Sequence, residues 1–265
     1  MPVVVALLLV VAVHLGTNLA AWGQVGLLAD DRFAVGLPIL LEWNHASLGE
    51  RAHAIFLPVV DEGASTALYR PVVSLLFCLE QPWFGVDARW YHAVNSLFHC
   101  ATAMAWFALV RRWSGLWVAG LAVALAFVGW PGHSEVTHWV SARVNLCAVC
   151  FMSLSLFAWD TAERRGANGF RWPMTGVALF LGLLALGSKE SAILLLPAAF
   201  LVSWLRMGDA GGMVARGWHS ALRVLPLFLL FLAFAALRRF VLHTWGAGTS
   251  SAWQLDVTSP AAWGA

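Results

Sequence analysis

The sequence predicts an all-α protein built as a polytopic bundle of transmembrane helices. Hydrophobic residues make up 60% of the 265-residue chain and charged residues only 11%. Several apolar runs are about 15 to 22 residues long, which suits helices that cross a bilayer core of about 30 Å. A soluble domain of this length has no use for so much apolar surface. We therefore expect a single membrane domain over residues 1–265.

Seven apolar runs qualify as spans of this bundle. Tryptophans stand near many of their ends, as in the aromatic belts at the two surfaces of a membrane. The first run lacks the basic start of a secretory signal, so we expect it to be retained as a helix. The predicted spans are Val3–Trp22, Trp90–Val110, Gly115–Trp130, Trp139–Trp159, Pro173–Gly187, Ser191–Leu205 and Leu225–Leu242.

Residues 23–88 form a long polar segment, predicted to be the first exoplasmic loop. Its part from Gly36 to Leu57 is partly amphipathic, which favours short interfacial helices on the membrane surface. Val72–Leu79 is apolar but too short to span, so we expect an interfacial or re-entrant segment there.

Arginines determine the predicted orientation. With the spans counted alternately, the loops Arg111–Arg112, Arg164–Arg171 and Arg206–Arg223 fall on one side, which the positive-inside rule makes cytoplasmic. The exoplasmic side then receives the remaining polar clusters, and their convergence predicts a functional site there. These clusters are Asp30–Asp31, His133–His138 and Lys189–Glu190.

The stretch PGHSEVTHWVSARVN, residues 131–145, concentrates polar groups between two apolar runs: His133, Glu135, His138, Arg143 and Asn145. Ionisable groups at the edge of hydrocarbon are costly, which indicates a functional site. The spacing HxExxH fits no zinc signature, so a hydrogen-bonded network is favoured over a metal site. A guanidinium suits phosphate oxygens, which makes Arg143 and Asn145 candidate phosphate ligands.

His92, Asn95 and His99 recur at helical spacing on one face of the second span. Polar residues on one face of a helix either form hydrogen bonds to a neighbouring helix or line a functional site. Three of them together favour the second alternative, that they line the site. Arg70 precedes Pro71, which disfavours a helix interior, so its guanidinium is either presented at the interface or snorkels there.

Lys189 and Glu190 interrupt an otherwise apolar region. They form either a simple ion pair or a lysine that reaches a phosphate with its glutamate in support. Arg238 ends the last span on the exoplasmic side, against the positive-inside bias, which indicates an anionic ligand.

Asp30 and Asp31 follow the first span directly. Alone they would be a solvated loop start or a helix cap. In a site, one of them is a candidate base for an acceptor hydroxyl. Adjacent carboxylates oppose each other's ionisation, which helps a base to work near neutral pH.

Other chemistry finds little support. The four cysteines include Cys147 and Cys150 as a CxxC, but it lies within an apolar run without a second pair, so we expect packing. A formal net charge of +2 with scattered basic residues indicates no nucleic-acid partner.

Taken in order, the motifs DD, YRP, HxxNxxxH, GHSEVTHWVSARVNL and SKESAILLLP resemble the membrane part of the GT-C glycosyltransferases. The branch they resemble contains the transmembrane, tetratricopeptide-repeat O-mannosyltransferases and their bacterial relatives. There the matching stretches read approximately DD, YRPL, HxxNxxLH, HPxHxEAVxWxxGRxDLL and KE. The resemblance covers most of the chain, and the order of the motifs is its specific part.

This resemblance implies an inverting enzyme that passes a sugar from a polyprenyl-phosphate carrier to an acceptor hydroxyl on the exoplasmic face. Asp30 would be the catalytic base with Asp31 beside it, and Arg143, Lys189 and Arg238 would hold the lipid phosphate. The nearest family members imply mannose and a protein acceptor, and bacterial members also imply glycan or lipid acceptors. We expect a bacterial inner-membrane protein with its site facing the periplasm. No cofactor is implied firmly, and a divalent metal is left open.

Three departures from the family pattern stand out. Gly132 and Ser141–Ala142 replace a proline and a small-residue pair with glycine, and Asn145 replaces a common aspartate. The sequence contains no tetratricopeptide region, so we expect a truncated or minimal form. The alternative function is a non-catalytic membrane protein that binds or moves a lipid-linked phosphate. A secondary transporter would instead predict internal repeats and polar groups at mid-span.

Overall fold

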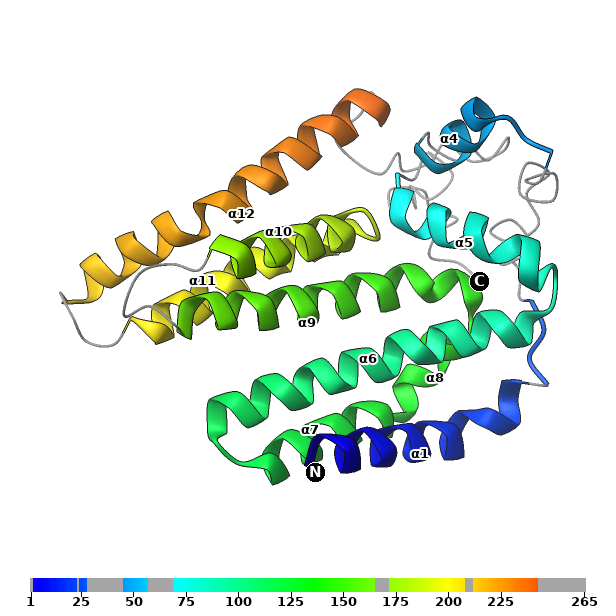
Figure 1. The fold of residues 1–265 in the computed structure, drawn as a ribbon, viewed down its shortest axis with the longest axis horizontal. Coiled ribbons are helices and arrows are strands. Elements are labelled where there is room, and N and C mark those ends of the chain that lie inside the picture. The colour runs from blue at the N-terminus through cyan, green and yellow to red at the C-terminus, as the bar shows by residue number, and fades with distance from the viewer. Residues whose placement is uncertain are drawn as a thin grey trace, which may run out of the picture.

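The computed structural model describes residues 2–22, 24–27, 45–56, 69–164, 172–207 and 212–242. Within these ranges the regular elements are helices, which confirms the all-α prediction (Figure 1). In chain order they are α1 (Pro2–Trp22), α4 (Leu48–Phe56), α5 (Pro71–Phe84), α6 (Ala88–Ser114), α7 (Trp117–Val128), η1 (Pro131–His133), α8 (Ser134–His138), η2 (Val140–Ala142), α9 (Arg143–Arg164), α10 (Trp172–Leu186), η4 (Glu190–Leu194), α11 (Leu195–Arg206) and α12 (Gly212–Leu242).

Four of these segments are long and apolar enough to cross a membrane, so the chain is an integral membrane protein. They cover Val3–Ala20, Ala88–Ser114, Val140–Arg164 and Gly212–Leu242. Trp117–Val128 and Pro131–His138, bent by 55° to each other, make a fifth if they count as one span. The predicted number of seven is not confirmed over the described residues. The fifth and sixth apolar runs form helices of only 15 and 12 residues, α10 and α11.

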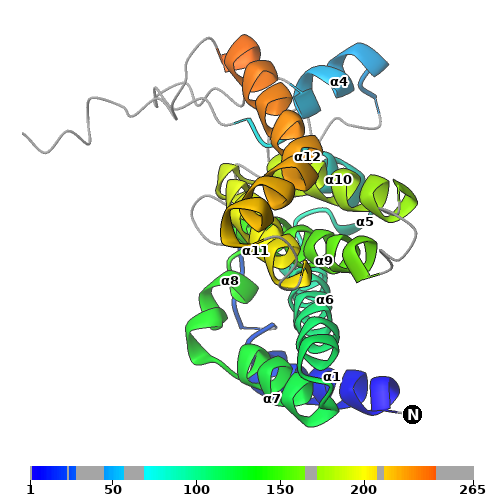
Figure 2. The same cartoon turned by 90° about the vertical axis from the view of Figure 1, so that its left-hand side faces the viewer.

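The helices pack in two groups, which Figures 1 and 2 show from two sides. In the first group α1, α6 and α7 share a core that includes Val10, Phe107 and Ala124. In the second group α9, α10, α11 and α12 share a larger core around Trp159 and Leu227. The two groups meet where α6 packs against α9.

Local signals set the ends of α6. The Asp87 side chain accepts a hydrogen bond of 3.1 Å from the Arg89 backbone N–H, and Gly115 ends the helix with φ 76°. An aspartate N-cap satisfies a free helical N–H, and glycine adopts left-handed φ without strain. Arg111 and Arg112 in the last turn complement the negative end of the helix dipole.

The predicted first loop is described only in part. Its described helix α4 falls in the predicted amphipathic range, and the predicted short segment Val72–Leu79 forms the first part of the 14-residue α5. The backbone N–H of Val72 donates to Gly187 O at 3.1 Å, so α5 is tied to the turn after α10. Asp30 and Asp31 lie outside the described residues.

Candidate functional site

The polar residues expected to share a site gather at one end of the bundle. We call this the site end, where α1 finishes and where α6 and α9 begin. The opposite end, where α6, α9 and α11 finish with Arg112, Arg164 and Arg206, is the arginine end.

Arg143, the first residue of α9, is fully buried at the centre of the site end. Its Nε donates to Asn95 Oδ1 at 2.8 Å and its Nη2 donates to the Tyr91 carbonyl at 3.0 Å. Its Nη1 pairs with the carboxylate of Glu80, and its guanidinium lies 4.7 Å from the centre of the Phe77 ring. Each of the three guanidinium nitrogens therefore donates to an acceptor in the protein. These contacts join α9 to α5 and α6.

Glu80 is a member of this network that the sequence reasoning missed. Burial raises the pKa of its carboxyl, and the charge and hydrogen bond of Arg143 oppose that rise. The signal was present in the sequence, because an acid directly after the apolar run Val72–Leu79 demands a partner. The identity of that partner was not visible, since Arg143 lies 63 positions away.

Three imidazoles form a chain between α1, α6 and η1. His99 Nδ1 lies 3.2 Å from His14 Nδ1, and His99 Nε2 lies 3.2 Å from His133 Nδ1. His133 Nδ1 also lies 2.8 Å from the Phe127 carbonyl. Because a carbonyl only accepts, this Nδ1 carries a proton, and in the neutral chain His99 accepts from His133 and donates to His14. His14 was not predicted, although His14 and Asn18 are polar residues one turn apart in an apolar helix.

A second set of contacts ties the end of α1 to α6 and α8. His92 Nε2 lies 3.0 Å from the Val25 carbonyl, and Thr137 donates to Asn18 Oδ1 at 3.0 Å. His138 lies beside them, with its ring centre 6.0 Å from that of His92. Val25 precedes Asp30 by five positions, so His92 anchors the chain shortly before the acidic pair.

Basic residues form a separate group at the site end, which we call the basic cluster: Arg70, Lys189 and Arg238. Glu190 lies between the two arginines, 4.0 Å from Arg70 Nε and 3.9 Å from Arg238 Nη2. Lys189 Nζ donates to the side-chain oxygen of Asn145. Burial lowers the pKa of Arg70 most, Glu190 opposes that change, and Arg238 adds to it. Among the described residues, this group therefore contains three cationic side chains and one carboxylate, with two of the cations beside Glu190 and the third beside Asn145.

The structure thus brings together most of the predicted residues, in two neighbouring arrangements. Arg143 links them, because it contacts Asn95 of the stripe on α6 and begins the same helix turn as Asn145. Glu135 is exposed on α8. Among the described residues, no three His, Cys, Asp or Glu side chains are arranged to hold a metal ion.

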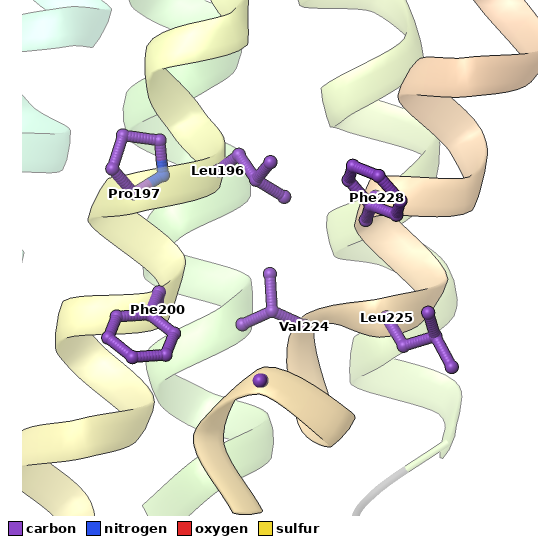
Figure 3. Close-up of a pocket in the computed structure, with 7 residues that line it drawn as sticks. Leu196, Pro197, Phe200, Val224, Leu225 and Phe228 are labelled. Carbon is purple, nitrogen blue, oxygen red and sulfur yellow. The ribbon is translucent and has the colours of Figure 1, made fainter. Parts of the chain in front are cut away.

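An apolar groove of about 420 Å³ lies between α11 and α12 (Figure 3). Leu196 and Phe200 line it from α11, and Val224 and Phe228 line it from α12. Phe228 precedes Arg238 of the basic cluster by ten positions on the same helix, which is about 15 Å along its axis.

Comparison with known proteins gives distant relatives. The chain is 32% identical over 153 residues to protein O-mannosyl-transferase Tmtc2 of Drosophila melanogaster, covering 56% of this chain and 16% of that protein. It is 30% identical over 137 residues to Tmtc1 of the same organism, covering 51% of this chain and 15% of that protein. It is 28% identical over 142 residues to TMTC1 of Homo sapiens, covering 50% of this chain and 16% of that protein.

The chain therefore spans about one sixth of the length of these relatives. No family model and no solved structure matches it. The predicted resemblance to the transmembrane O-mannosyltransferases is thus confirmed as a distant relationship to proteins that carry this name. Membership of the GT-C superfamily and the bacterial inner-membrane location stay predictions.

Proposed function

We propose that this chain is a membrane glycosyltransferase that transfers a sugar from a polyprenyl-phosphate carrier to an acceptor hydroxyl. The names of its relatives favour mannose as that sugar. The reaction takes place at the site end, which the positive-inside rule makes exoplasmic. One observation carries the proposal: among the described residues, Arg70 and Arg238 flank the carboxylate of Glu190, and the adjacent Lys189 contacts Asn145 at the start of α9. The relatives named O-mannosyl-transferases support the sugar-transfer chemistry.

The basic cluster is the proposed binding site for the phosphate of the donor. A sugar phosphodiester carries one negative charge, and arginine and lysine donate short, charge-assisted hydrogen bonds to its oxygens. Glu190 holds Arg70 and Arg238 near each other, so the two guanidinium groups are positioned before the donor arrives. Arg143 acts differently, because its guanidinium is committed to Glu80, Asn95 and Tyr91. It positions α9, and with it Asn145.

The groove between α11 and α12 suits the hydrocarbon tail of the same donor. Its lining is apolar, and α12 carries both the groove and Arg238. A polyprenyl chain along α12 would bring its phosphate to the basic cluster.

The acidic pair supplies the proposed base. The acceptor oxygen attacks the anomeric carbon and forms the new glycosidic bond, while its proton passes to the carboxylate of Asp30. The bond between that carbon and the phosphate oxygen breaks, and its electron pair leaves with the lipid phosphate, so the anomeric configuration inverts. The basic cluster stabilises the charge that develops on the leaving phosphate. Asp31 orients Asp30 or the acceptor.

Sugar transfer from radiolabelled polyprenyl-phosphate mannose by the protein in lipid nanodiscs tests this proposal, with peptide, glycan and lipid acceptors offered together. We expect Asp30→Asn with Asp31→Asn to abolish transfer and to leave donor binding intact. Lys189→Gln and Arg238→Gln should weaken donor binding by about tenfold or more each, since each removes a charged hydrogen bond worth about 1.5–3 kcal/mol.

Arg89→Gln is the matched control, because it removes a positive charge from an exposed ion pair with Asp87 away from the basic cluster. Saturable donor binding without transfer by the unmodified protein would favour the alternative of a lipid-phosphate binding protein. Absence of donor binding, or transfer that survives in the double aspartate variant, would contradict the mechanism.

A further inference from the structure

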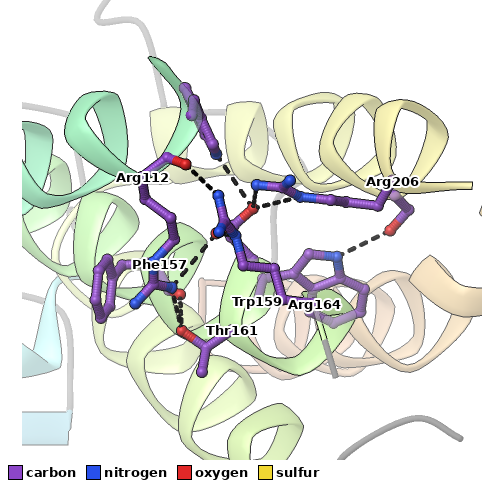
Figure 4. A network of polar contacts seen from close by, with 9 residues as sticks. Arg112, Phe157, Trp159, Thr161, Arg164 and Arg206 are labelled. Carbon is purple, nitrogen blue, oxygen red and sulfur yellow. Dashed lines mark hydrogen bonds and ion pairs between the residues drawn. The ribbon is translucent and has the colours of Figure 1, made fainter. Parts of the chain in front are cut away.

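A second charged network lies at the arginine end, far from the proposed reaction. The side chain of Asp160 on α9 is fully buried, and three arginines from three helices converge on it (Figure 4). Arg112 of α6 approaches it at 3.4 Å, Arg164 of α9 at 3.2 Å and Arg206 of α11 at 2.6 Å. The Trp113 indole also donates to its carboxylate, at 3.1 Å.

The charges of this network do not balance. Among the described residues, three guanidinium groups meet one carboxylate, so these four side chains carry a net charge of +2 (three minus one). A carboxylate has about four acceptor positions, whereas each guanidinium has five N–H groups. The Thr161 hydroxyl accepts from Arg112, and the Arg112 carbonyl accepts from Arg164. The arginine side chains nevertheless remain 24%, 35% and 27% exposed.

A second buried carboxylate on α9 shows how an ion pair with a purely structural role is arranged. The side chain of Glu163 is also fully buried, and it pairs with one arginine, Arg223 of α12. Its other oxygen accepts from Ser203 at 2.8 Å, and the Ser203 hydroxyl accepts from the Trp159 indole at 3.0 Å. One guanidinium group therefore balances the charge of one carboxylate in this pair. The positive charge around Asp160 therefore exceeds what burying a carboxylate demands.

The exposed side chains around this network favour a location at a membrane surface. Trp113, Leu116 and Trp117 are exposed beside Arg112, which is typical of the belt where aromatic rings meet lipid head groups. Phosphates of the leaflet lie at this depth. Uncompensated cations at the margin of a low-dielectric region favour an anionic partner.

We propose that Arg112, Arg164 and Arg206 bind the phosphate of an anionic phospholipid head group in the leaflet at the arginine end, cytoplasmic by the positive-inside rule. Guanidinium groups bind phosphate oxygens in pairs of parallel hydrogen bonds. Asp160 keeps the three side chains close against their mutual repulsion. Since Arg112 belongs to the first helix group and Arg206 to the second, the bound lipid stabilises the contact between the two groups.

Thermal unfolding in nanodiscs tests this binding. The unmodified protein should unfold at a higher temperature in discs of phosphatidylcholine with phosphatidylglycerol than in phosphatidylcholine alone. Arg164→Gln and Arg206→Gln should lose this difference, and native mass spectrometry should show loss of retained phosphatidylglycerol. Arg206→Lys retains the charge but not the paired hydrogen bonds, so it should fold like the parent and retain less lipid.

Two controls distinguish a bound head group from a general effect of charge and from a soluble anion. Arg89→Gln removes the same charge at the other end of the bundle, so the lipid-dependent difference should persist. Inorganic phosphate added to phosphatidylcholine discs should not reproduce the difference. If it does, the ligand is a soluble anion and the lipid assignment fails. Equal unfolding temperatures in both lipids, or an undiminished difference in the two glutamine variants, would overturn the proposal.

Discussion

At the scale of single residues, the ion pair between Glu80 and Arg143 holds helices together at the site end. Arg143 is fully buried, the side chain of Glu80 is 12% exposed, and the pair connects α5 to α9. A buried charge that loses its partner destabilises a protein by about 3–5 kcal/mol, more than most surface contacts contribute. The packing of the site end therefore depends on the ion pair between Glu80 and Arg143. Of these two residues, only Arg143 was predicted from the sequence to belong to the site.

We expect Glu80→Ala to lower the free energy of unfolding by about 3–5 kcal/mol, because Arg143 would stay buried without a counter-charge. Unfolding of the protein in detergent, followed by circular dichroism, measures the loss. Glu135→Ala removes an exposed carboxylate on α8 and should change little. In the double variant Glu80→Leu with Arg143→Met both charges are absent, so its loss should be smaller than that of Glu80→Ala. A larger loss would show that the charges themselves are not the cause.

Sequence reasoning identified Asn95 and Arg143 as site residues but did not foresee that they bind each other. They are 48 positions apart, and Glu80 is a further partner from a different helix. The cost of placing an ion near hydrocarbon is visible in a sequence, because it depends on composition nearby. The partner that offsets the cost depends on how helices pack, which helical spacing on one segment does not specify.

At the scale of helices, hydropathy predicted where the apolar runs lie better than how each run folds. α6 begins at Ala88 and ends at Ser114, slightly outside the predicted Trp90–Val110, because Asp87 and Gly115 cap it. The third run ends in the 55° bend before Pro131, and the sixth begins as the 3-10 helix η4. Bends and tightened turns use the same apolar residues as a straight helix, so the apolar pattern does not report them.

Close approach of α6 and α7 depends on Gly120. A Cβ atom at this position would lie 2.6 Å from the Phe107 carbonyl oxygen, and a backbone oxygen cannot yield as a flexible side chain would. We expect Gly120→Ala to push the helices apart and to lower the free energy of unfolding by about 1–3 kcal/mol. Comparison of unfolding midpoints measures this loss.

The same substitution at Gly176 supplies the control. Gly176 lies within α10, and nothing stands within 4 Å of a Cβ atom there. Alanine also restricts the unfolded chain, so Gly176→Ala should leave stability unchanged or raise it by about 0.4–1 kcal/mol. Equal losses at the two positions would attribute the effect to helix glycines in general and not to the α6–α7 contact.

At the scale of the whole molecule, the two ends of the bundle are chemically different. The site end combines imidazoles, an internal ion pair and the basic cluster, whereas the arginine end gathers guanidinium groups around Asp160 and Glu163. One arginine from each of the three loops predicted to share a side contacts a common carboxylate, since Arg112, Arg164 and Arg206 all approach Asp160. The composition of three separate loops does not reveal this contact. The direction in which the bundle crosses the membrane rests on the positive-inside rule.

Labelling of introduced cysteines determines which end of the bundle faces the outside of the cell. The four native cysteines are buried, so a membrane-impermeant maleimide should react only with introduced ones. Ser47 precedes α4 and Ser114 ends α6, and both are exposed. We expect Ser47→Cys to react from outside intact cells, and Ser114→Cys only after permeabilisation, since α6 separates the two positions. The reverse pattern would invert the bundle and place the basic cluster in the cytoplasm. Labelling of both from one side would mean that the short helix α5 also crosses the membrane, because a second crossing returns the chain to its starting face.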